Sequence, residues 1–235
     1  MESFPDQWYK GFVKPLHKGG SRESLDNYRG INLTSNVYKL FTSVVESQFM
    51  PFLEENEILH EVQGACRKGR RLEDQFFTLK GLCSLRKSRK LKTWLAYLDI
   101  SKAFDTVDRD RLFVHLWKKG VQGKAWRLIK GLYSKVDNKV IFGPYESSWF
   151  EVMNGVKQGC ILSPTLFSLV MSDLADMLYG HNLGIPFGKG KIPCLLYADD
   201  VCLLGDNEEN LQKMLSVSHA FASKWNMSLT MISLK

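Results

Sequence analysis

The sequence has few features of a secreted or membrane protein. Its five cysteines are an odd number with no CxxC spacing, so we expect free thiols, and neither a disulfide framework nor a structural zinc. The first residues lack the basic and apolar segments of a signal peptide. The apolar runs are too short to cross a bilayer. We therefore expect a soluble, intracellular protein that has no membrane partner.

Phosphate-binding glycine motifs are also missing. The chain contains no P-loop and no GxGxxG, which argues against a nucleotide-binding metabolic enzyme. It has no internal repeat and no low-complexity tract. In 235 residues with 44% hydrophobic side chains there is enough apolar surface for one large domain or two small ones. The formal net charge of +7 favours an acidic partner such as nucleic acid.

Hydrophobic spacing predicts a mixture of helices and strands without regular βαβ alternation. This pattern is typical of an α+β protein with a mainly antiparallel sheet and helices packed against it. A Gly-rich, charged segment over 14–30 is expected to be a loop, and Pro51 is expected to interrupt a helix. The predicted helices cover 31–56, about 72–85, 108–119, 123–135, 163–179 and 207–225, and the predicted strands 93–100, 140–142 and 149–153.

Three acidic residues stand at the ends of apolar strands. The segment CLLYADDVCLL (194–204) predicts a tight hairpin with Asp199 and Asp200 at its tip, and Asp99 lies near the end of the strand 93–100. Three carboxylates brought together would repel one another unless a divalent cation neutralised them, and oxygen ligands suit Mg²⁺. The alternative is an Asx-type turn at Asp199 and a helix N-cap at Asp99.

Four ordered blocks carry a resemblance to a known family. TWLAYLDISKAFDTVDR, NGVKQGCILSPTLF and LLYADD resemble motifs A, B and C of reverse transcriptases, most closely those of non-LTR (LINE-like) retrotransposons and group II introns. Upstream, KPLHKGG and NYRGINLTSNVYKLF resemble the start of the fingers in that family. The resemblance extends from about Trp8 to Trp225. It implies an α+β right-hand polymerase fold with fingers and palm.

The resemblance implies a site for two Mg²⁺ ions, for which Mn²⁺ can substitute. Asp99 and Asp199 match the metal-binding aspartates, Asp200 matches the adjacent third acid, and the Ile100 carbonyl would be a backbone ligand. The three acids would be the catalytic carboxylates of nucleotidyl transfer.

It also implies contacts to the incoming dNTP. Phe104, which follows Ala103, matches the bulky residue that excludes a ribose 2′-OH. Gln158 matches the residue that contacts the incoming nucleotide near its sugar, and Gly159 would permit close backbone approach there. Arg67 and Arg70 match the fingers cations that grip the triphosphate, and Lys68 could serve instead. The alternatives are an ordinary core aromatic at Phe104 and a solvated basic turn at RKGR.

Two departures from the family pattern bear on these expectations. The fingers turn has Ala65-Cys66 where the pattern usually reads Gly-Phe, so its apolar anchor is smaller. Beyond the last predicted helix, Thr230 and Ser233 occupy the positions of the usual Asn and Lys. Lys235 lies two positions later, and we do not assign it the protonation of pyrophosphate.

We expect fingers over 1–92 and a palm over 93–235, with about 119–153 able to return to the fingers and the chain truncated before a thumb. The expected function is RNA-directed DNA polymerase, with an RNA template, a DNA primer, dNTPs and an element-encoded RNA as partners, in the cytoplasm or the nucleus. The alternative is a catalytically inactive, truncated nucleic-acid-binding remnant. The sequence leaves the oligomeric state open.

Overall fold

The computed structural model describes residues 4–232 and divides them into two compact units. Each unit combines two stretches of the chain. The first contains residues 4–49 and 107–163, and the second contains residues 50–106 and 164–232. Which parts act as fingers and palm stays a prediction. Within 4–232, no helix is long and apolar enough to cross a membrane.

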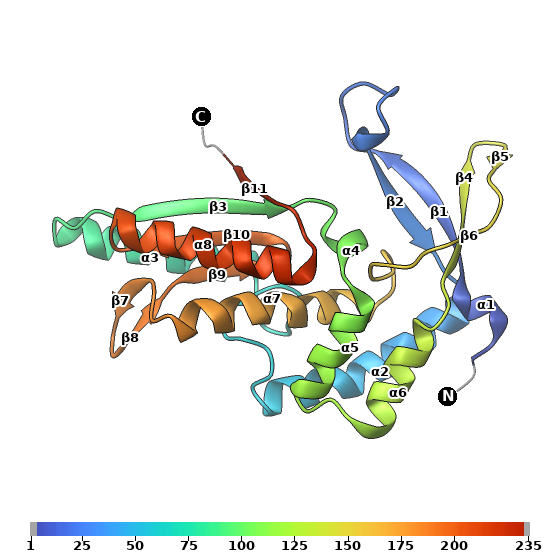
Figure 1. Ribbon diagram of the computed structural model, residues 1–235, viewed down its shortest axis with the longest axis horizontal. Coiled ribbons are helices and arrows are strands. Elements are labelled where there is room, and N and C mark those ends of the chain that lie inside the picture. The colour runs from blue at the N-terminus through green and yellow to red at the C-terminus, as the bar shows by residue number, and fades with distance from the viewer. Residues whose placement is uncertain (1–3, 233–235) are drawn as a thin grey trace. The chain divides into compact units, whose positions relative to one another are not determined.

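The first unit is built on a five-stranded sheet in the order β2-β1-β4-β5, with β6 also paired to β4 (Figure 1). β1 and β4 run parallel, and the other pairs are antiparallel. Its elements are α1 Asp6–Tyr9, β1 Lys10–His17, the 3₁₀ turn Leu25–Asn27, β2 Tyr28–Leu33, α5 Arg109–Lys118, α6 Gly123–Leu132, β4 Asp137–Phe142, β5 Tyr145–Glu146 and β6 Phe150–Glu151.

The second unit has a four-stranded antiparallel sheet in the order β11-β3-β10-β9 and a small hairpin of β7 and β8. Its elements are α3 Leu72–Ser88, β3 Trp94–Ile100, α4 Ala103–Thr106, β7 Ile185–Phe187, β8 Gly190–Ile192, β9 Cys194–Tyr197, β10 Asp200–Gly205, α8 Glu208–Trp225 and β11 Leu229–Ile232. Two helices, α2 Asn36–Glu55 and α7 Ser163–Gly180, have residues in both units.

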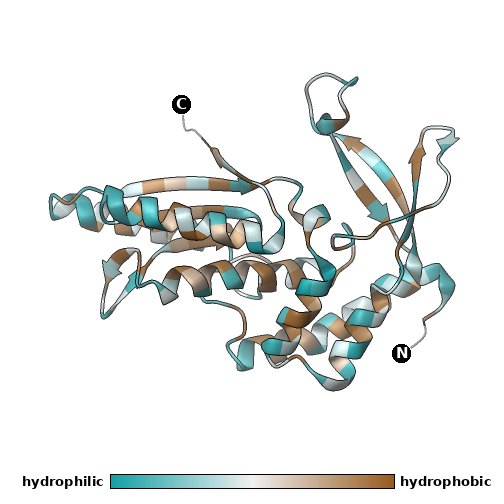
Figure 2. Ribbon diagram, viewed as in Figure 1, coloured by the Kyte–Doolittle hydropathy of each residue, from teal (hydrophilic) through white to brown (hydrophobic). Residues whose placement is uncertain are grey.

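Strands β9 and β10 of the second unit are largely buried on both faces. On one face, β9 and β10 present Leu195, Cys202 and Leu204 to Leu79 and Leu82 of α3. The neighbouring residues along each strand point to the opposite face, because side chains alternate along a strand. The helix α8 packs against β3 and β10. Figure 2 shows α7 coloured hydrophobic along most of its length, whereas α8 has mixed colours. This double burial explains why β9 and β10 read as continuous apolar runs.

Local signals fix the ends of the two surface helices. The Asp74 carboxylate accepts a hydrogen bond from the Arg71 backbone N–H at 2.8 Å at the start of α3. The Asn207 side chain accepts from the Asn210 N–H at 2.8 Å and begins α8, and Asn226 ends it in the left-handed conformation. The predicted helix over 207–225 and the predicted strand over 93–100 are therefore confirmed to within one residue.

Two predictions near the N-terminus were wrong, the first of them only in part. Within the expected loop over 14–30, residues 18–27 do connect two strands, but 14–17 and 28–30 belong to the strands of the β1–β2 hairpin, whose register pairs Phe12 with Leu33 and His17 with Tyr28. Pairing with β4, which is distant in sequence, supplies the neighbour that a local pattern cannot reveal. Pro51 does not end α2, which continues to Glu55. Burial of Phe49 and Leu53 on either side of the proline supports the helix across the missing backbone hydrogen bond.

Candidate active site

Two neighbouring strands of the second unit bring the acidic residues together. β10 pairs with β3 so that Val201 lies opposite Leu98, and the same register continued by one residue sets Asp200 opposite Asp99. Tyr197 pairs with Asp200 across the hairpin, which leaves Ala198 and Asp199 as its two-residue turn. Because directly opposite residues are nearest neighbours on one face of a sheet, the three carboxylates share one edge.

The environment of Asp200 disfavours its negative charge. Burial, and then the charges of Asp199 and Asp99, raise the pKa of the Asp200 carboxyl above its ordinary range. A mainly apolar groove of about 470 Å³ begins at Asp200 and runs along β3, β9, β10 and α3. Among the described residues, none of the three aspartates forms an ion pair that would offset this repulsion. The three carboxylates therefore repel one another, and a nearby cation would be favoured.

A divalent cation would relieve this repulsion, and the donor set suits one. In residues 4–232 no group of three or more acidic, histidine or cysteine side chains is arranged so that it could hold a metal ion by itself. Mg²⁺ does not require such a group, because it commonly takes one or two carboxylates and completes its shell with water and substrate phosphates. Ile100 ends β3, is 2% exposed and lies opposite Leu229 of β11. The cluster thus fits an open, hard-cation site.

Phe104 lies shortly after the Asp99 strand in the same unit. It belongs to α4, whose first residue, Ala103, is buried. The Phe104 ring stacks on the Phe167 ring of α7 with centroids 5.0 Å apart and an interplanar angle of 19°. The ring is only half-buried, so it combines a core contact with an accessible side.

Gln158 and Gly159 belong to the first unit, whereas the three aspartates belong to the second. The Gln158 carbonyl accepts a hydrogen bond from the Asn32 N–H at 2.9 Å, which ties this loop to β2. Gly159 has φ of +107°, and a Cβ there would lie 2.6 Å from the Asn32 carbonyl oxygen. Only glycine fits this close backbone approach.

The basic turn after α2 divides its three cations into different environments. Arg67 is buried: its Nε donates to Glu54 at 2.7 Å, and its Nη1 donates to the carbonyls of His60 and Gln63 at 2.9 and 3.1 Å. Arg70 donates to the Glu61 carboxylate at 2.6 Å. Lys68 is exposed. Arg67 therefore holds its own loop, and Lys68 is the cation most accessible to a ligand.

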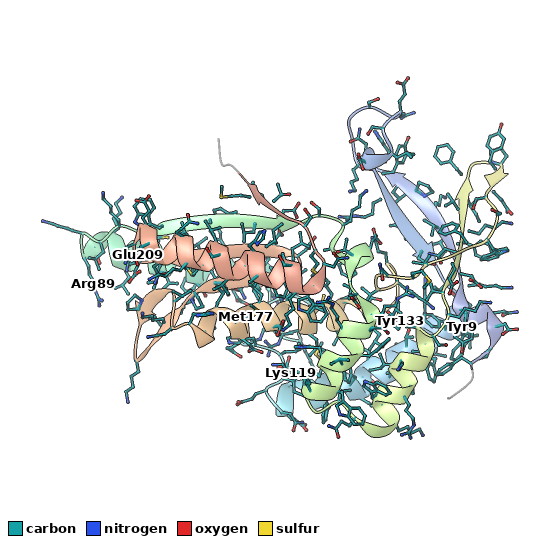
Figure 3. The ribbon with its side chains drawn as sticks, in the orientation of Figure 1. Tyr9, Arg89, Lys119, Tyr133, Met177 and Glu209 are labelled. Carbon is teal, nitrogen blue, oxygen red and sulfur yellow. The ribbon has the colours of Figure 1, made fainter. Side chains whose placement is uncertain are left out.

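Sequence reasoning missed two buried polar residues. Gln63 is fully buried against Ala198 of the hairpin turn, and the only signal was a glutamine among small and apolar neighbours. Lys157 lies in the first unit, donates to the Trp8 carbonyl at 2.9 Å and sits 4.7 Å from the Tyr38 ring centroid. Tyr133, labelled in Figure 3, is 5.8 Å away. Trp8, Tyr38 and Tyr133 are distant from Lys157 in sequence, so no local pattern could reveal that they surround its ammonium group.

Comparison with known proteins identifies the family. The family described as "Reverse transcriptase (RNA-dependent DNA polymerase)" matches residues 16–231. The chain belongs to this reverse transcriptase family, and its relatives include polymerases of non-LTR retrotransposons.

One relative is the Pol polyprotein of the type-1 retrotransposable element R2 of Popillia japonica, 30% identical over 96% of this chain and 31% of the relative. Another is the RNA-directed DNA polymerase of the mobile element jockey of Drosophila melanogaster, 24% identical over 96% of this chain and 25% of the relative. The chain thus spans at most about a third of these relatives.

Among solved structures, apo telomerase of Candida tropicalis has a TM-score of 0.68 at 13% identity, over 99% of this chain and 46% of that chain. This likeness supports the same fold. The residues Ser233 and Lys235, discussed above for pyrophosphate protonation, lie outside the described residues.

Proposed function

We propose that the chain carries the polymerase activity of a non-LTR retrotransposon reverse transcriptase and adds dNTPs to a DNA primer on an RNA template. The observation that supports this most is the shared edge of Asp99, Asp199 and Asp200, where burial, and then the charges of the other two acids, raise the pKa of the Asp200 carboxyl. An acidic cluster without a neutralising cation is costly to keep unless it binds something positive.

In this proposal Asp99 and Asp199 hold two divalent ions, with Asp200 and the Ile100 carbonyl beside them. When bound, Mg²⁺ or Mn²⁺ would lower the pKa of the primer 3′-hydroxyl and stabilise charge on the leaving pyrophosphate. Phe104 occupies the space beside the sugar C2′ with its accessible side. Its stack on Phe167 fixes the ring, so that a ribose hydroxyl meets a rigid wall.

Gln158 is proposed to contact the dNTP near its sugar, with Gly159 permitting close backbone approach, and the hydrogen bond from Asn32 would hold their loop in place. Lys68 is proposed as the main fingers cation for the triphosphate, with Arg70 able to join it by exchanging its exposed contact with Glu61. The +7 net charge supports binding of a template and primer through their phosphates.

The test is extension of a labelled DNA primer on an RNA template with Mg²⁺ and dNTPs. We expect extension by the parent and none by Asp199→Asn, because the amide removes a metal ligand at nearly constant volume. Asp110→Asn, at an exposed position of α5, is the matched control and should extend like the parent. Equal extension by Asp199→Asn would contradict the metal assignment, and no extension by the parent would favour the inactive remnant.

A further inference from the structure

The hairpin that carries Asp199 and Asp200 turns through an unusual residue. A two-residue β-turn needs positive φ at one or both central positions, and glycine or asparagine normally supplies it. Here Ala198 occupies the first central position with φ of +54°. A Cβ in this left-handed region is disfavoured, so the turn adjacent to the acids needs outside support.

Gln63 supplies that support from a segment distant in sequence. Its side-chain Oε1 accepts a hydrogen bond from the Ala198 N–H at 3.1 Å, and its Nε2 donates to the Ala198 carbonyl at 3.4 Å. Both backbone polar groups of Ala198 are thereby engaged by one amide. Oε1 also accepts from the Ala65 N–H at 3.0 Å, and Gln63 is 0% exposed.

The backbone around Gln63 is itself fixed against β9. The Gly64 N–H donates to the Leu196 carbonyl at 2.9 Å, and the Leu196 N–H donates to the Val62 carbonyl at 3.0 Å. Arg67 donates to the Gln63 carbonyl and is paired with Glu54 of α2. The amide of Gln63 therefore reaches the turn from a rigid loop.

We infer that Gln63 is a positioning residue that holds Ala198 in its left-handed conformation and so aims Asp199 and Asp200 at the bound cations. Its effect on catalysis rests on the proposed function. Only an amide of this length offers both a donor and an acceptor to the turn. Glutamate keeps the acceptor but has no N–H to donate, and methionine has neither strong group.

Two matched variants separate this role from general stability. Gln63→Met removes every hydrogen bond to the turn at similar volume. Gln75→Met is the control, because Gln75 donates to the Val62 carbonyl at 3.2 Å and touches the same segment without reaching Ala198. The first readout is the hydrogen-exchange rate of the Ala198 amide, measured by NMR on the metal-free protein. The second is Mn²⁺ affinity, measured by electron paramagnetic resonance of free Mn²⁺.

We expect Gln63→Met to speed exchange at Ala198 by about tenfold, the equivalent of one lost hydrogen bond. Mn²⁺ binding should weaken by about 10- to 100-fold, as it does when groups that orient metal ligands are removed. In primer extension kcat should fall while the dNTP KM stays within about twofold, because the triphosphate contacts are intact. Gln75→Met should leave Ala198 exchange and Mn²⁺ affinity as in the parent.

The inference would be overturned if Gln63→Met had the same Ala198 exchange rate and the same Mn²⁺ affinity as Gln75→Met. If Gln63→Met does not fold, Gln63→Glu replaces it as the test. Glutamate retains the acceptor for the Ala198 N–H, so this variant should keep most of the exchange protection at Ala198. Loss of that protection counts against the inference. Neither readout requires polymerisation. A parent that binds Mn²⁺ in a Gln63-dependent way but never extends a primer contradicts the proposed function alone.

Discussion

Replacement of Arg67 by alanine decides between two roles for this residue. The family resemblance suggests a contact to the dNTP triphosphate, whereas the structure shows a guanidinium that is engaged by Glu54 and by two backbone carbonyls. Only 3% of the Arg67 side chain is exposed. The two roles predict different balances between stability and substrate affinity.

The magnitude follows from the groups that Arg67→Ala leaves without a donor. The carbonyls of His60 and Gln63 lose a partner, at about 1 kcal/mol each for buried groups. The charge-assisted bonds to Glu54 are worth about 1.5–3 kcal/mol when buried, but the Glu54 side chain is 36% exposed and regains water. We expect a loss of about 3 kcal/mol in the free energy of unfolding.

Arg70→Ala is the matched control because it removes a cation three residues later whose pair with Glu61 is exposed. Such surface pairs contribute about 0–1 kcal/mol. The assay is urea denaturation followed by circular dichroism, together with the dNTP KM for primer extension. If Arg67→Ala were no less stable than Arg70→Ala and raised the dNTP KM about tenfold, the triphosphate role would be correct and our assignment refuted.

Two further predictions concern Phe104 and Lys157. Phe104→Ala should lower the discrimination between dATP and ATP in primer extension and cost about 1–2 kcal/mol of stability through the lost stack on Phe167; unchanged discrimination would remove Phe104 from the sugar site. Burial lowers the pKa of Lys157 to about 8. Above that pH the folded protein releases the Lys157 proton while the unfolded chain still holds it, so the free energy of unfolding should rise with pH. From about pH 8 to about pH 9.5 the parent should gain up to about 2 kcal/mol relative to Lys157→Met, measured by urea denaturation, and a flat difference between them would contradict this.

The parts of the fold that follow from local patterns could be predicted from the sequence. The hairpin around Asp199 was evident because its apolar arms flank a charged tip, and α8 was evident from its helical spacing between Asn207 and Trp225. The β1–β2 hairpin was missed because its strands are partly polar and because β1 also pairs with β4, which lies more than a hundred residues away. Long-range pairing leaves no local period to detect.

The candidate site shows the same limit. The aspartates could be named because carboxylates at strand ends are unusual without a function. The environment of Arg67 could not be anticipated, because Glu54 lies on a separate helix and sequence cannot tell a buried ion pair from an exposed basic turn. Likewise, the engagement of Ala198 by Gln63 depends on a single parallel bridge between Gln63 and Leu196.

The interleaving of the two units limits how this chain can fold during synthesis. The polypeptide passes from one unit to the other after residues 49, 106 and 163, so neither unit is a contiguous segment. A ribosome-bound chain that ends before residue 164 has α3 and β3 but lacks β10, which pairs with β3, and β9, which contacts α3. The apolar side chains of β3 therefore stay exposed until the last third of the chain has been synthesised. A nascent intermediate presents them to chaperones until the YADD hairpin has left the ribosome.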